Sequence, residues 1–249
     1  MGTESIESSF LSIFALISFF IFLLISKFSS IIKSGVLLDI DFEKPQAFHE
    51  QAVTRSGGIA AIISISIFFG IYYLLYSKIL YDYIFISYSM FLIGFIDDLK
   101  INIKPFKRLL IMTIMLFTFI YFFPIKILNI DISFLEFINN NNFFSSIFTL
   151  LCFLFIINGA NLIDGFNGLL SLNLIIINVI LAYINLENDN LEFSLLIIAQ
   201  IIILLSFLLF NFPKAKMFLG DSGSYLFGSL TVAREVTYHL AFQQHFLSL

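Results

Sequence analysis

Three acidic clusters, each next to an apolar run, contain the residues of this chain best suited to chemistry. The first is the pair Asp97-Asp98, the second is the segment 158–168, and the third is the segment 214–224 around Asp221. Charged groups beside hydrocarbon are energetically costly, so such clusters indicate function more often than structure. Taken together, they predict metal-assisted phosphate chemistry at a membrane face.

The adjacent carboxylates Asp97 and Asp98 are expected at the carboxyl end of a helix, where partial negative charge adds to their mutual repulsion. A bound cation would relieve both effects. Mg²⁺ is usually held by one or two carboxylates and takes waters and substrate phosphates as its other ligands. The alternative is an interfacial pair that is solvated and neutralised by Lys100 or Arg108.

The second cluster combines amides, a carboxylate and glycines. Asn158, Asn161 and Asp164 are spaced three apart, so they share one face if the helix continues through them. Amides and a carboxylate on one face can bind the donor and acceptor edges of a sugar or a base. Gly165 and Gly168 would interrupt the helix and let a ligand approach the backbone. The alternative is that the amides only hold helices together within the bilayer.

The third cluster and the first long polar loop both suit anions. Asp221 stands at the expected start of a helix, where it would serve as an N-cap or as a ligand of a metal or phosphate site. The loop 44–58 contains Lys44 and Arg55, which suit a loop folded over a polyphosphate. Lysine binds phosphate as a point charge, whereas arginine binds it as a planar fork.

Composition predicts that these clusters are positioned by an all-α, polytopic membrane bundle. The 249 residues are 59% hydrophobic and 12% charged, and the mean hydropathy is +1.00. Because a helical crossing needs about 20 predominantly apolar residues, we expect a single domain, 1–249, with seven or eight crossings. The expected crossings are 10–25, 59–75, 79–96, 109–123, 143–157, 169–184 and 193–210, and an eighth apolar stretch begins at Ser224.

The distribution of basic residues predicts the orientation. With the amino terminus outside, ten Lys or Arg residues fall in inside loops and two or three in outside loops, as the positive-inside bias requires. All three acidic clusters and the loop 44–58 then lie on the cytoplasmic face. The dispersed basic residues and the net charge of −4 indicate no nucleic-acid partner.

Four motifs in fixed order resemble a known family. The segments 54–58, 94–98, 158–168 and 218–224 are similar to those of the polyprenyl-phosphate N-acetylhexosamine-1-phosphate transferases, glycosyltransferase family 4. That family includes phospho-N-acetylmuramoyl-pentapeptide transferase and undecaprenyl-phosphate N-acetylglucosamine-1-phosphate transferase. The resemblance covers about Lys44 to Gly228. It implies transfer of a sugar 1-phosphate from a UDP-sugar to polyprenyl (undecaprenyl) phosphate, with release of UMP and a requirement for Mg²⁺.

The resemblance also implies a cellular setting and roles for individual residues. The setting is the bacterial inner membrane, where such enzymes initiate cell-wall or surface-polysaccharide lipid intermediates, and a homodimer is compatible with it. Asp221 and Asn161 would ligate the metal, and Asp97 or Asp98 would activate the lipid phosphate for direct attack. Phe218 would stack on uracil. The substrate-binding positions that the resemblance implies are Asn158, Asp164, Phe218, Asn167, Arg55, Arg108 and Lys44.

The carboxyl end departs from the family pattern. The family continues beyond the position of Gly228 through further spans and a loop with a His-x-His-His cluster, whereas His239 and His245 here are six apart. We therefore expect those spans and that loop to be missing. Two alternatives stay open, namely a catalytically impaired paralogue acting as a membrane assembly partner and an ion-coupled transporter with carboxylates near mid-bilayer. For the transferase, a simple or modified N-acetylhexosamine is expected ahead of a muramoyl-pentapeptide.

Overall fold

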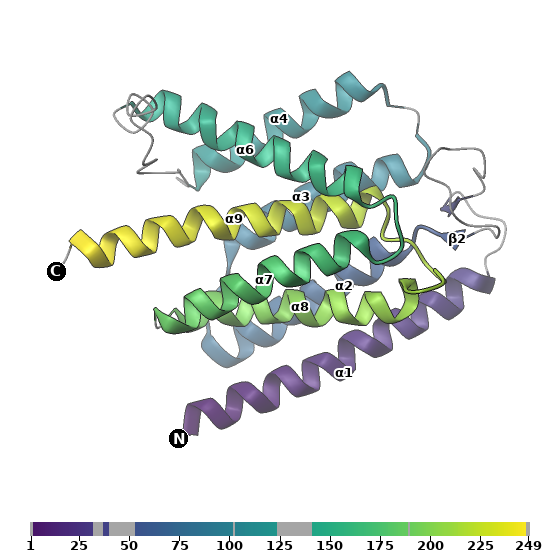
Figure 1. Ribbon diagram of the computed structural model, residues 1–249, viewed down its shortest axis with the longest axis horizontal. Coiled ribbons are helices and arrows are strands. Elements are labelled where there is room, and N and C mark those ends of the chain that lie inside the picture. Colours follow the sequence, from purple (N-terminus) through teal and green to yellow (C-terminus); the bar gives the residue numbers. More distant parts are fainter. Residues whose placement is uncertain are drawn as a thin grey trace.

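The computed structural model describes residues 2–31, 37–39, 53–101, 103–123, 141–188 and 190–247. Within these ranges the chain is a bundle of helices with one two-stranded antiparallel pairing beside it (Figure 1). The helices are α1 (Gly2–Ile31), α2 (Gly57–Tyr76), α3 (Tyr81–Asp98), α4 (Pro105–Phe122), α6 (Asn142–Ile163), α7 (Leu169–Glu187), α8 (Leu191–Asn211) and α9 (Gly220–Leu247). The strands are β1 (Leu38–Asp39) and β2 (Val53–Thr54).

Six of the described helices, α1, α2, α4, α6, α7 and α8, are long and apolar enough to cross a membrane by length and composition. The expected all-α, polytopic bundle is therefore confirmed. Each expected crossing overlaps one helix. α3, which carries Asp82 as well as Asp97 and Asp98, and α9 are not among the six. The count of seven or eight crossings accordingly stays a prediction.

α9 is the central helix of the bundle. It packs against α2, α3, α6 and α7, and every residue from Ser222 to Ala233 is buried. In Figure 1 it lies, in yellow, between α6 and α7 and in front of the fainter α3. Hydroxyl groups on this enclosed helix bond to its own backbone, since Ser229 and Thr231 donate to the carbonyl oxygens of Leu226 and Phe227. The start of α9 is thus held on several sides.

The helix ends that carry the acidic clusters meet at one end of this bundle. The backbone N–H groups of Gly57 and Gly58 donate to the carbonyl oxygens of Phe218 and Leu219 at 2.9 and 2.8 Å. The N–H of Phe218 donates in turn to the carbonyl of Thr54 at 2.8 Å. These bonds tie β2 and the start of α2 to the segment that leads into α9.

α3 approaches the start of α9 very closely at Gly94. A Cβ on Gly94 would overlap the backbone carbonyl of Asp221 and would lie 2.5 Å from the backbone nitrogen of Ser222. Backbone atoms cannot turn aside as the end of a flexible side chain can. Only glycine at this position therefore allows the carboxyl end of α3 to lie against the amino end of α9.

We expect Gly94→Ala to destabilise the protein by about 1–3 kcal/mol, as overpacking of a close contact typically does. Gly70→Ala in α2 is the matched control, because a Cβ there meets nothing within 4 Å. Alanine also favours a helix over glycine by about 1 kcal/mol. Thermal unfolding in detergent should show a lower Tm for Gly94→Ala and an unchanged or higher Tm for Gly70→Ala. Equal Tm values would contradict the close contact.

Candidate active site

Asp97, Arg108 and Asp221 come together where α3, α4 and α9 meet. Nη1 of Arg108 forms an ion pair with Oδ2 of Asp97 and lies 3.4 Å from Oδ2 of Asp221. All three side chains keep partial access to solvent. Two carboxylates that are far apart in the sequence thus converge on one positive charge, which brings together the first and third acidic clusters.

Asn161 connects the second cluster to the third. Its Oδ1 accepts a hydrogen bond from Oγ of Ser224 at 2.9 Å, and its Nδ2 donates to the hydroxyl of Tyr225 at 3.3 Å. Cζ of Arg108 lies 5.8 Å from the centre of the Tyr225 ring, within the range of a cation–π contact. The amide of Asn161 is therefore fixed next to the residues that surround Asp221.

Asp164 lies in the electrostatic field of the same groups. It follows the last residue of α6 and is partly buried. Burial, and after it the negative charges of Asp221 and Asp98, raise the pKa of the Asp164 carboxyl well above its usual value, while Arg55 acts in the opposite direction. Carboxylates from all three clusters are therefore near enough to influence one another.

Asp98 holds the amino end of α9. Its side chain is fully buried, and its two oxygens accept the backbone N–H groups of Asp221 at 3.0 Å and Ser222 at 2.9 Å. These N–H groups belong to the first turn of α9 and have no partner within the helix. Nη1 of Arg55 lies 3.7 Å from Oδ1 of Asp98. Burial raises the pKa of Asp98 to about 6, against the lowering effect of the hydrogen bonds from Ser222.

Gly220 makes room for this cap. Its φ is +76°, a left-handed backbone conformation that residues other than glycine rarely adopt. A Cβ at this position would lie 2.6 Å from Oδ2 of Asp98. The glycine before Asp221 thus serves the turn into α9 and the approach of the capping carboxylate.

Several predicted site residues make contacts to the backbone. Nδ2 of Asn158 donates to the carbonyl of Leu154 in its own helix at 2.7 Å, and Nδ2 of Asn167 donates to the carbonyl of Pro213 at 3.1 Å. Phe218 is partly buried, and its backbone is bonded to its neighbours as described above. Lys44 lies outside the described residues. Asn158 and Asn167 therefore bond to backbone carbonyls. The predicted site residues that the structure brings together are Asp97, Asp98, Arg55, Arg108, Asn161, Asp164 and Asp221.

The sequence reasoning missed three residues that organise the site. Ser224 and Tyr225 contact Asn161, and their spacing of three and four from Asp221 puts them on the same helix face, which is a usable signal. Asn211 ends α8, where its Oδ1 accepts the N–H of Gly168 at 2.6 Å and its Nδ2 donates to the carbonyl of Met217 at 3.0 Å. The sequence signal for Asn211 was its position as an amide residue directly after the apolar run 193–210.

Asp97 and Asp221 fit a divalent cation held by two carboxylates. Nη1 of Arg108 already lies against one oxygen of each, so positive charge is favoured at that point. Among the described residues, no group of three or more His, Cys, Asp or Glu side chains could hold a metal ion. A Mg²⁺ ion here would therefore have at most these two carboxylates, with an amide oxygen, waters and substrate phosphates as further ligands.

Comparisons with known proteins identify relatives of the chain. A phospho-N-acetylmuramoyl-pentapeptide-transferase of Streptococcus sanguinis (strain SK36) is 38% identical over 82 residues, which are 33% of this chain and 25% of that protein. The protein of that name from Bacillus pumilus (strain SAFR-032) is 30% identical over 214 residues, 77% of this chain and 63% of the relative. The one from Streptococcus pneumoniae (strain 70585) is 28% identical over 221 residues, 83% of this chain and 65% of the relative.

The chain spans less than two thirds of the length of each of these three relatives, which are covered over 25%, 63% and 65% of their sequences. The family model described as Glycosyl transferase family 4 matches residues 79–239. That range runs from the start of α3 into α9 and contains every acidic residue of the site. The chain therefore belongs to glycosyl transferase family 4.

Proposed function

We propose that this chain transfers a sugar 1-phosphate from a UDP-N-acetylhexosamine to polyprenyl phosphate, such as undecaprenyl phosphate, and releases UMP. The observation that carries the proposal is the convergence of Asp97 and Asp221 on Arg108 at one end of a polytopic helical bundle. The name of the relatives, phospho-N-acetylmuramoyl-pentapeptide-transferase, supports the same class of reaction.

The proposed chemistry is direct attack of a lipid phosphate oxygen on the β-phosphorus of the UDP-sugar. This reaction needs charge neutralisation and in-line positioning more than a strong nucleophile. The guanidinium of Arg108 can bind phosphate oxygens through its planar fork. We assign proton acceptance from the lipid phosphate to Asp97 rather than Asp98, because Asp97 is partly exposed and Asp98 is fully buried.

In this proposal Asp221 and the amide oxygen of Asn161 would hold Mg²⁺, and Asp97 is left to accept the proton. When bound, the ion would supply positive charge beside the phosphates of the donor. Phe218 would stack on uracil, since it lies in the segment that leads directly into Asp221. The other proposed substrate contacts are Asn158, Asp164, Asn167, Arg55 and Lys44.

The position of the carboxylates favours an interfacial enzyme over an ion-coupled transporter. Asp98 is the last residue of α3, and Asp221 is the second residue of α9. A coupling site would instead have its carboxylates near the middle of the bilayer. The positive-inside distribution supports a cytoplasmic site, and the relatives support the bacterial inner membrane.

Within the proposed class, the relatives change the expected order of donors. Their name favours UDP-N-acetylmuramoyl-pentapeptide over the simpler N-acetylhexosamines that the sequence suggested. Both kinds of donor present the same uridine and pyrophosphate to the acidic site.

Release of UMP by the purified chain tests the proposal. The chain is reconstituted with undecaprenyl phosphate and Mg²⁺, and each UDP-sugar is supplied in turn. We expect UMP with at least one donor, and none without either the lipid phosphate or the metal. Mg²⁺-dependent binding of a UDP-sugar without turnover would contradict catalysis and would favour the assembly partner.

We expect Arg108→Lys to lower kcat/KM for UMP release by roughly 10²-fold, which is typical for loss of one well-placed donor group. Nη1 of Arg108 faces both Asp97 and Asp221, and lysine keeps the charge but lacks the second nitrogen of the fork, which would remain for a phosphate oxygen. Lys107→Ala is the control, because it removes an exposed charge at the preceding position. Wild-type kinetics for Arg108→Lys would argue that a point charge is sufficient.

A further inference from the structure

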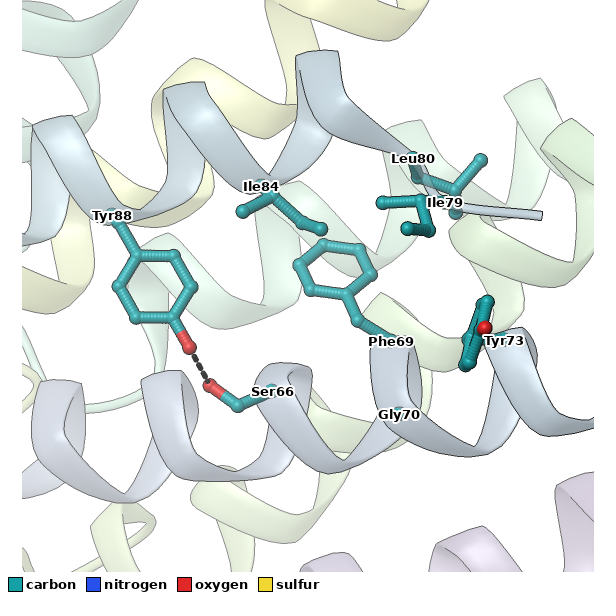
Figure 2. A pocket seen from close by; sticks show the side chains of 8 residues that line it. All are labelled: Ser66, Phe69, Gly70, Tyr73, Ile79, Leu80, Ile84 and Tyr88. Carbon is teal, nitrogen blue, oxygen red and sulfur yellow. Dashed lines mark hydrogen bonds between the residues drawn. The ribbon is translucent and has the colours of Figure 1, made fainter. Parts of the chain in front are cut away.

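A pocket between α2 and α3 lies apart from the acidic site. Its volume is about 270 Å³, and its lining is mostly apolar and aromatic. Figure 2 shows Ser66, Phe69 and Tyr73 on α2 facing Ile84 and Tyr88 on α3, with Ile79 in the connection between the helices. The pocket occupies the half of these helices that is farther from the acidic site.

One hydrogen bond joins the pocket residues that are nearest in sequence to the acidic ends of α2 and α3. The hydroxyl oxygens of Ser66 and Tyr88 lie 2.6 Å apart, so the two polar groups satisfy each other (Figure 2). Both α2 and α3 pack more extensively against α9 than against each other. Beyond the hydroxyl pair they leave a space whose walls offer no free charge, which favours a hydrocarbon over a polar ligand.

Gly70 keeps this space open. A Cβ at Gly70 would meet nothing within 4 Å, so no described neighbour requires a glycine there. Its φ is not in the left-handed range, and glycine is a poor helix former. Neither packing against the described residues nor backbone conformation accounts for the glycine, and because Gly70 lines the pocket, a larger side chain there would occupy part of it.

The mouth of the pocket lies at the level expected for a membrane interface. Tyr73 is 49% exposed and Tyr81 is 64% exposed, and both lie beside the α2–α3 connection. Tyrosines concentrate at the boundary between hydrocarbon and headgroups. In the same connection, Nζ of Lys78 pairs with Oε2 of Glu192 at 2.6 Å. These residues at the mouth of the pocket are of the kinds expected where hydrocarbon meets headgroups.

We propose that this pocket binds an acyl chain of a phospholipid from the leaflet opposite the acidic site. The tail of an acceptor lipid bound at the acidic site is a poorer occupant. Tyr88 and Asp97 are nine residues apart on α3, and at ~100° per residue they lie on opposite faces of the helix. A tail from the acidic site would have to pass around α3 to reach the pocket.

A single tryptophan can report the occupant, because the chain contains none. Tyr73→Trp puts the fluorophore at the mouth of the pocket. Tyr121→Trp is the control, because Tyr121 is 75% exposed on α4. Phospholipid brominated along its acyl chains is added to each variant in detergent. We expect saturable quenching at one lipid per protein for Tyr73→Trp, and quenching that only follows the lipid fraction of the micelle for Tyr121→Trp.

Filling the pocket should remove the saturable quenching. In the Tyr73→Trp background, we expect Gly70→Leu to abolish it without lowering the Tm, and Leu74→Ala, which alters a 78% exposed residue outside the lining, to preserve it. Persistence of saturable quenching in Gly70→Leu would overturn the proposal. So would stronger competition by unbrominated polyprenyl phosphate than by unbrominated phospholipid. This test needs no turnover, so its failure is distinguishable from failure of the proposed transferase.

Discussion

Asp221→Asn is expected to lower the rate of UMP release by roughly 10²–10³-fold, as loss of one preorganised electrostatic contact in an active site does. The amide keeps the shape of the carboxylate but brings no charge to a cation or to Arg108, whose Nη1 lies 3.4 Å from Oδ2 of Asp221. The fold should persist, because the Asp221 side chain is partly exposed and its backbone N–H still donates to Asp98. Steady-state UMP release and the Tm, measured on one preparation, separate the two effects.

Asp82→Asn is the matched control for this variant. Asp82 lies in the first turn of α3, at the opposite end of the helix from Asp97 and Asp98. The same loss of one carboxylate charge there should change UMP release by less than twofold. If Asp221→Asn turned over like the wild type, Asp221 would have no part in the proposed chemistry.

The sequence was sufficient to predict the helices because bilayer thickness sets the length of an apolar run. The expected crossing 193–210 lies within α8, Leu191–Asn211, and the crossing 59–75 lies within α2, Gly57–Tyr76. Polar or charged residues, glycine or proline mark the ends of the runs, and at one end of the bundle such residues form the acidic site. Placement of the clusters at helix ends followed from the same pattern.

The sequence could not predict that Asp98 caps α9 while Asp97 pairs with Arg108. The two carboxylates are adjacent, and their roles depend on the rotation of α3 against α9, which the contact at Gly94 fixes. For Asp221 the sequence left open an N-cap or a ligand of a metal or phosphate site, and the structure supplies the capping carboxylate from Asp98 on another helix. Such a contact between distant segments leaves no local pattern in the sequence.

Loss of the Asp98 carboxylate is expected to have the largest effect on stability. Asp98→Ala would leave the N–H groups of Asp221 and Ser222 without their acceptor at a buried helix end. An unsatisfied buried donor costs about 1–3 kcal/mol, so the two together predict a loss of roughly 2–6 kcal/mol. Thermal and denaturant unfolding in detergent, followed by circular dichroism, measures it. Asp98→Asn keeps one oxygen acceptor, so its free energy of unfolding should lie between those of Asp98→Ala and the wild type.

Asp97→Ala is the comparison that separates capping from catalysis. Asp97 is the neighbouring carboxylate, but its ion pair with Arg108 is partly exposed, and such pairs contribute about 0–1 kcal/mol. We therefore expect Asp97→Ala to lose UMP release while it unfolds near the wild-type Tm. For Asp98→Asn we expect a lower Tm than for the wild type. Equal destabilisation of Asp97→Ala and Asp98→Ala would show that Asp98 does not cap α9. The choice of Asp97 over Asp98 as proton acceptor would then rest only on the partial exposure of Asp97, without the commitment of Asp98 to the two N–H groups of α9.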